Sequence, residues 1–167
     1  LKVLGFVNAG TLYETDEKTY IEGDSMEIIK DLKELNGTCY IEVLPGKYNG
    51  VCWNAESIFF DEESFSYLEK LIGQIYGEYD HYDFSVIYKD DWNKILDLLD
   101  EFMEFLKRSP KSEEMENYVD YFFVNSKENF NMNFNENVQV LKVFITDFQD
   151  WIRKQLNNHD YISILGI

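Results

Sequence analysis

The chain of 167 residues carries 32 acidic and 15 basic side chains, which gives a formal net charge of −17 at pH 7. Hydrophobic residues make up 45% of it, with 12 Tyr and 13 Phe, and this content excludes the class of disordered acidic proteins, in which high charge accompanies low hydrophobicity. A chain of this length buries about 70% of its unfolded surface around one core, so we expect a single folded domain over residues 1–167 with an acidic surface.

Strand-forming residues dominate the chain up to residue 60, and one helix is expected among them. The expected strands are short and lie at 3–7, 12–13, 20–21, 38–44, 51–53 and 58–60. The second and third of these are expected to pair as a hairpin. Asp24 or Ser25 provides an N-cap, and apolar residues follow at helical spacing, so we predict a helix that Gly37 closes.

Helical spacing of apolar residues continues through most of the remaining chain. It predicts four helices, at 62–76, 90–109, 112–125 and 138–156. Residues 78–88 are expected to be a loop, and residues 125–137 an Asn-rich linker. Residues 161–167 are almost wholly apolar, and we expect them to be buried as a strand, because an exposed apolar terminus is disfavoured in water.

The order of these elements predicts an α+β fold, with one mostly antiparallel sheet of four to six strands packed with about five helices. No run of residues approaches the roughly 18 apolar residues of a membrane span, and the opening apolar run is too short for a signal sequence. Cys39 and Cys52 are expected to be buried free thiols in a reducing compartment, with a disulfide between adjacent strands as the alternative. We therefore expect a cytoplasmic protein.

The sequence contains no motif for catalysis or for binding a cofactor. His81 and His159 are the only histidines, and neither lies at the spacing of a known metal site. Arg108 and Arg153 are the only arginines, and no basic patch is present for the phosphates of a nucleic acid. We predict no catalytic residue, no metal, no cofactor, and no direct contact with nucleic acid or membrane.

Acidic side chains concentrate in the middle of the chain, where the predicted helix at 90–109 carries four of them on one side. Asp97, Asp100, Glu101 and Glu104 follow the spacing i, i+3, i+4 and i+7, which forms an exposed acidic ridge along a helix. A solvated helix face without a partner is the alternative interpretation. The ridge is nevertheless suited to steering a basic protein into contact.

Tyrosines alternate with acids just before this helix. Tyr79, Asp80, Tyr82 and Asp83 combine the amphipathic aromatics typical of interface hot spots with charges that attract a basic partner. Packing of the tyrosines into the core is the alternative. We expect these four residues to form a partner-binding face together with the acidic ridge.

Short runs between residues 51 and 105 carry a resemblance to a known family. They are Trp53 to Glu56, Phe59 to Asp61, Tyr79 to Tyr82 with Ser85 and Ile87, and Asp91-Trp92 with Ile95 and Leu99. Together these runs resemble immunity proteins of bacterial polymorphic-toxin and contact-dependent growth inhibition systems. The resemblance implies a small acidic cytoplasmic protein without catalysis, which binds a sibling toxin, often a nuclease, and blocks it. It assigns no contact to any residue.

These observations predict an immunity protein that neutralises a cognate basic toxin. Two other functions remain open. An acidic mimic of nucleic acid would occupy a nucleic-acid-binding protein in the same electrostatic way. A metal-assisted hydrolase would need clustered acids such as Asp80, Asp83, Asp90 and Asp91 to converge in a pocket.

Overall fold

The computed structural model describes residues 26–167. The strands expected at 3–7, 12–13 and 20–21 lie outside the described residues. The rest form an α+β fold with a four-stranded antiparallel sheet, so the predicted fold class is confirmed.

The sheet joins segments that are far apart in the sequence. Its strands are β1 (Ile41–Pro45), β2 (Ile58–Phe60), β3 (Phe84–Tyr88) and β4 (Tyr161–Leu165). They lie in the order β2-β1-β4-β3, and every pairing is antiparallel. The apolar C-terminal strand β4 is buried, as its composition predicts, with Ile162 and Ile164 in the core, and it lies in the interior of the sheet between β1 and β3.

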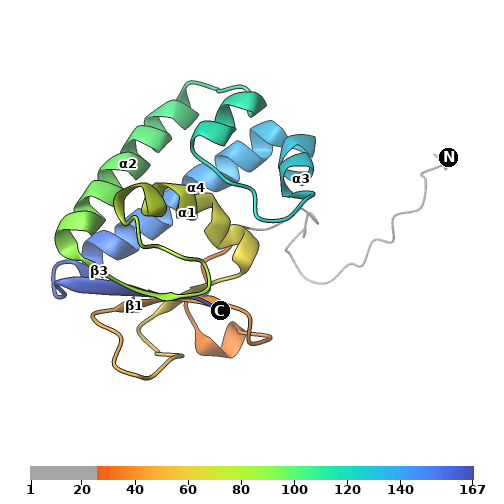
Figure 1. Ribbon diagram of the computed structural model, residues 1–167. Coiled ribbons are helices and arrows are strands. Elements are labelled where there is room, and N and C mark those ends of the chain that lie inside the picture. The colour runs from red at the N-terminus through yellow and green to blue at the C-terminus, as the bar shows by residue number, and fades with distance from the viewer. Residues whose placement is uncertain (1–25) are drawn as a thin grey trace, which may run out of the picture.

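Helices cover one face of this sheet, and a loop covers the other (Figure 1). The helices are α1 (Glu62–Ile75), α2 (Lys89–Lys107), α3 (Ser126–Met132) and α4 (Phe134–Gln155), with the short 3-10 helices η1 (Leu32–Glu34) and η2 (Ser112–Asn117). Asp61 caps α1 by accepting a hydrogen bond from the Ser64 backbone N–H at 2.7 Å. The loop between β1 and β2 crosses the second face of the sheet.

Aromatic side chains between the sheet and the helices form the centre of the core. Phe60 of β2 meets Phe144 and Phe148 of α4 edge to face, each with ring centroids 5.9 Å apart. Trp92 is fully buried in the first turns of α2, and its indole N–H donates to the Ile162 carbonyl of β4 at 3.1 Å. These contacts fix α2 and α4 to the sheet.

The prediction of a helix between Ser25 and Gly37 is wrong. Of its described residues only Leu32–Glu34 are helical, as the 3-10 turn η1. Ile29 instead pairs with Phe59 of β2 through two backbone hydrogen bonds of 2.9 Å. Because β2 has no other neighbour on that side within residues 26–167, pairing along this edge satisfies backbone groups that an isolated short helix leaves to water.

Four further predictions of secondary structure are corrected. Residues 51–53 form a loop, since Trp53 has a φ of 64° that no strand accommodates. The predicted loop at 78–88 contains strand β3, the predicted helix at 112–125 is only η2, and the Asn-rich linker contains α3. Both cysteines are free, as predicted, but neither is buried: Cys39 is exposed and Cys52 is half-buried.

Candidate functional site

The acidic ridge of Asp97, Asp100, Glu101 and Glu104 lies on the exposed side of α2, as the spacing predicts. All four side chains are exposed, whereas Leu99 and Phe102 between them are buried in the core. The ridge is positioned by the packing of Trp92, Leu99 and Phe102 at full burial on the opposite side of the helix. The helix period, together with the burial of the apolar side of α2, therefore determines which way the carboxylates face.

Ion pairing divides the ridge into two halves. Asp100 accepts two hydrogen bonds of 3.0 Å from the Arg153 guanidinium and one of 2.7 Å from the Gln149 amide. Glu104 pairs with Lys107 at 2.6 Å. Among the described residues, Asp97 and Glu101 have neither an ion pair nor a hydrogen bond from a side chain. These two carboxylates are thus the members of the ridge that are free to meet an external cation.

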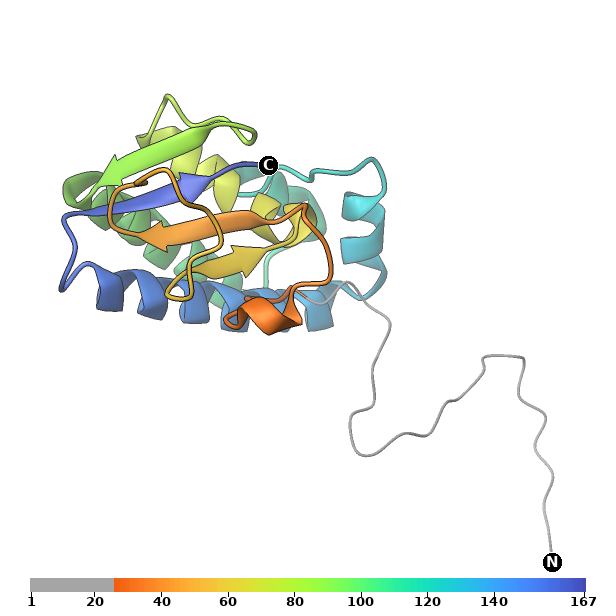
Figure 2. The same cartoon turned by 90° about the horizontal axis from the view of Figure 1, so that it is seen from below.

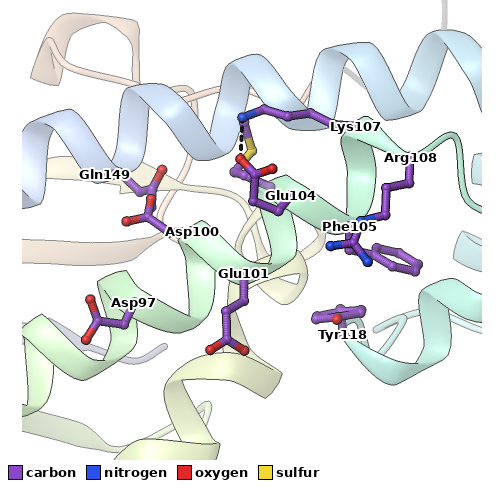
Figure 3. A pocket seen from close by; sticks show the side chains of 10 residues that line it. Asp97, Asp100, Glu101, Glu104, Phe105, Lys107, Arg108, Tyr118 and Gln149 are labelled. Atoms are coloured by element: carbon purple, nitrogen blue, oxygen red, sulfur yellow. Dashed lines mark hydrogen bonds and ion pairs between the residues drawn. The ribbon is translucent and has the colours of Figure 1, made fainter.

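The ridge borders a surface hollow of about 710 Å³. The lining also contains Phe105, Lys107, Arg108 and Tyr118, and in Figure 3 Asp100 lies beside Gln149 while Glu101 points away from α4. Tyr118 stacks on Phe102 with ring centroids 4.7 Å apart and an angle of 9° between the rings. The hollow therefore combines carboxylates with a rigid aromatic wall.

The predicted partner-binding segment at 79–83 is held to α1 by a cluster of polar contacts. The Tyr79 hydroxyl donates to the Glu69 carboxylate, and the same carboxylate oxygen lies 2.6 Å from His81 Nδ1. Phe122 stacks on the His81 ring with centroids 4.5 Å apart. Tyr79 packs against the core, so this tyrosine takes the core position that the sequence left as the alternative.

The other residues of the segment face solvent. Tyr82 is 63% exposed. Asp80 accepts a hydrogen bond from the Tyr82 N–H at 2.9 Å, and Asp83 accepts one from the Phe84 N–H at 2.9 Å. Gly166 passes so close that a Cβ there would lie 2.5 Å from the His81 carbonyl oxygen. No hydrogen bond, ion pair or ring contact within residues 26–167 joins this segment to the acidic ridge.

We predict that Tyr79 contributes stability that is lost in alkaline solution. Burial, and then the adjacent Glu69 carboxylate, raise the pKa of the Tyr79 hydroxyl well above its usual value. Above about pH 10 the unfolded chain loses this proton while the folded chain keeps it, so the free energy of unfolding falls as pH rises. Urea unfolding at about pH 9 and about pH 11 should show a smaller fall for Tyr79→Phe, which has no proton to lose. Equal falls in both proteins would contradict this assignment.

Glu42 is a buried acid with a structural role that the sequence did not indicate. This glutamate of β1 is 3% exposed and accepts four hydrogen bonds, with lengths between 2.6 and 3.0 Å. The donors are the backbone N–H groups of Trp53 and Asn54 and the side chains of Asn54 and Ser57. A lone acid within the apolar run Ile41 to Leu44 was the available signal, because a charge is seldom buried without a set of partners.

The Glu42 contacts explain the structural role of the run Trp53 to Glu56. They anchor the loop between β1 and β2 over the sheet, where Trp53 stacks on Phe59 with ring centroids 5.8 Å apart. Ser163 anchors the start of the same loop by accepting from the Tyr48 N–H at 3.0 Å and donating to the Gly46 carbonyl at 2.8 Å. The run Trp53 to Glu56, which contributes to the resemblance, therefore belongs to a loop that hydrogen bonds hold to the sheet.

The clustered acids named for a metal-assisted hydrolase do not converge. Within residues 26–167, no group of three or more His, Cys, Asp or Glu side chains is placed to hold a metal ion. Asp91 pairs with Lys94 at 2.7 Å, and Asp80 and Asp83 accept backbone hydrogen bonds in their own turn.

Within residues 26–167, no helix combines the length and the apolar composition that crossing a membrane requires.

Comparison with known proteins assigns no relative to this chain. No known protein family matches it, and no significant match was found among curated proteins or solved structures.

Proposed function

We propose that this protein is a cytoplasmic immunity protein that binds a cognate basic toxin and neutralises it without catalysis. The observation that carries the proposal is the acidic ridge on α2, in which Asp97 and Glu101 are exposed beside the hollow and have no side-chain partner among residues 26–167. The net charge of −17 supports it, because a surplus of this size is a cost of self-repulsion that a cationic partner relieves.

The chemistry of the ridge suits a toxin that acts on nucleic acid. Such a toxin needs a cationic cleft for phosphates, and the ridge offers carboxylates at the i, i+3, i+4 and i+7 positions in their place. Tyr118 and Phe105 supply an aromatic wall next to these charges, where the stem of a lysine or arginine side chain would pack. Complementary charge also accelerates association, to about 10⁸ M⁻¹s⁻¹ or more at low salt.

The first experiment is co-purification of the protein expressed from its native operon. The proposal expects a basic polypeptide to accompany it, whose toxicity on separate expression is suppressed by this protein. A nucleic-acid-binding protein of the host, in place of a toxin, would favour the nucleic-acid mimic. Purification without any basic polypeptide would contradict both functions.

Charge reversal on the ridge then tests the binding face. The double variant Asp97→Lys with Glu101→Lys should slow association with the co-purified toxin at least about tenfold at low salt, because rim charges act mainly on the association rate. Thermal stability should change little, since both side chains are exposed and neither has a partner to lose in the described part of the chain. Stopped-flow fluorescence at two salt concentrations measures the rate.

A matched control makes the same change of charge elsewhere. Glu128 of α3 and Asp147 of α4 are exposed, and Glu128→Lys with Asp147→Lys alters the net charge equally. If both double variants slow association to the same extent, the effect belongs to the net charge of the protein, and the assignment of the ridge as the binding face is wrong.

A further inference from the structure

The two edges of the sheet differ in how they end. On the β2 edge, Ile29 forms two backbone hydrogen bonds of 2.9 Å with Phe59. On the opposite edge, β3 has no strand beyond it within residues 26–167. Figure 2 shows β3 along one border of the sheet and η1 beyond β2 at the other. An open edge of this kind is a template for pairing with another strand.

The register of β3 shows which of its backbone groups face outward. The backbone N–H of Gly166 donates to the Asp83 carbonyl, and the backbone N–H of Lys89 donates to the Asp160 carbonyl. Both are bonds between residues that lie directly opposite each other in this pairing. Bonded and non-bonded positions alternate along an antiparallel pair, so Ser85 faces β4, as does Ile87.

The residues between them therefore turn their backbone groups away from β4. These outward residues are Phe84, Val86 and Tyr88. The Phe84 N–H already donates to the Asp83 carboxylate. The Phe84 carbonyl, both backbone groups of Val86 and the Tyr88 N–H have no hydrogen-bond partner within residues 26–167. A short extended segment laid along β3 would bond to these groups.

The side chains on the same residues make this edge apolar. Phe84 is 44% exposed and Tyr88 is 43% exposed. Each is held by one neighbouring ring on the loop-covered face of the sheet, since Tyr48 meets Phe84 edge to face at 4.9 Å and Tyr161 lies 5.1 Å from Tyr88. Alternate side chains of an added strand would pack beside this aromatic row.

Charges at the two ends of β3 indicate what the added strand carries. Asp80 and Asp83 lie at its start, and Asp90 follows its end, all three exposed. Two lysines lie near this edge: the Lys89 ammonium donates to the Leu156 carbonyl at 2.7 Å, and the Lys47 ammonium lies over the Tyr161 ring, 4.0 Å from its centroid. A second copy of this chain would bring another net charge of −17 to the same edge, which opposes pairing between copies.

From this geometry we propose that β3 is a strand-addition site for an extended segment of a partner protein, with alternating apolar residues and with lysine or arginine at its ends. The segment pairs with the outward groups of Phe84, Val86 and Tyr88 and places its cations beside Asp80, Asp83 and Asp90. This surface is separate from the acidic ridge. Its test uses no toxin, so either proposal can fail without the other.

Amide hydrogen exchange, followed residue by residue by NMR on the full chain, tests the site. The probe is a synthetic peptide in which valine and threonine alternate between paired lysines at both ends. We expect the peptide to slow exchange of the Val86 and Tyr88 amides at least about tenfold, while the Ser85 and Ile87 amides are protected with or without it. The same peptide with glutamates in place of the lysines should bind at least about tenfold more weakly.

The variant Val86→Pro removes the central outward N–H. Proline is tolerated at an edge position whose N–H faces solvent, and unchanged protection of Ser85 and Ile87 verifies that β3 remains paired with β4. Val86→Thr, which keeps the N–H, is the matched control. We expect Val86→Pro to weaken peptide binding about tenfold or more and Val86→Thr to change it less than about twofold.

Four results would overturn the proposal. They are unchanged exchange at Val86 and Tyr88 with saturating peptide, equal binding of Val86→Pro, equal binding of the glutamate peptide, and protection of the two edge amides in the free protein. In the last case, protection that rises with protein concentration would identify a second copy as the occupant. Protection that is independent of concentration would identify a segment of the same chain.

Discussion

Replacing Glu42 by alanine is expected to lower the free energy of unfolding by about 3 kcal/mol, a large fraction of the stability of a domain of this size. The Glu42 carboxylate accepts from the backbone of Trp53 and Asn54 and from Ser57. Each buried donor left without an acceptor costs about 1–3 kcal/mol. Trp53 also holds a left-handed backbone conformation, with a φ of 64°, and a residue other than glycine is strained there by about 1–2 kcal/mol. The carboxylate offsets that strain.

Two variants separate the charge from the contacts. In Glu42→Gln, the amide oxygen can keep the three bonds now made by Oε1, but its NH₂ group then faces the Trp53 N–H, so a smaller loss of about 1–2 kcal/mol is expected. Glu56 lies in the same loop and is exposed, so Glu56→Ala should stay within about 0.5 kcal/mol of the wild type. Urea unfolding measures all three. An alanine variant at position 42 as stable as Glu56→Ala would show that the carboxylate does not hold the loop.

Replacing Trp92 by alanine is expected to destabilise the protein by about 3–5 kcal/mol. Trp92 of α2 is fully buried and contacts two other elements. Its ring meets Phe148 of α4 with ring centroids 6.2 Å apart, and its indole N–H donates to the Ile162 carbonyl of β4. Truncation leaves a cavity where α2, α4 and the sheet meet. Because the acidic ridge is on the same helix, the variant should also show faster amide exchange along α2.

The variant Trp92→Phe distinguishes the hydrogen bond from the packing. It keeps an aromatic ring and removes the donor to Ile162, so a loss of about 1–2 kcal/mol is expected. Val143 of α4 is 63% exposed, and Val143→Ala should stay within about 0.5 kcal/mol of the wild type. The midpoint and slope of urea unfolding provide the comparison. If Trp92→Ala loses no more stability than Val143→Ala, the indole does not join the helices to the sheet.

The candidate site was predictable where one helix carries it. The spacing of Asp97, Asp100, Glu101 and Glu104 places all four on the exposed side of α2, because the helix period is a local property of the chain. Which of them are paired was not predictable. Arg153, which bonds to Asp100, is 53 positions further along the chain, and only the packing of α4 beside α2 brings it there.

By itself the sequence determined the α+β class, helices α1, α2 and α4, and the buried strand at Tyr161–Leu165, since each follows from periodicity, caps or composition over a short window. Tertiary structure alone decided the conformation at Ile29, whose backbone pairs with Phe59 and does not form the predicted helix. It likewise decided the burial of Glu42 under its loop and the central position of β4 between β1 and β3. These outcomes depend on backbone and carboxylate groups finding partners far away in the sequence, and no local pattern encodes such partners.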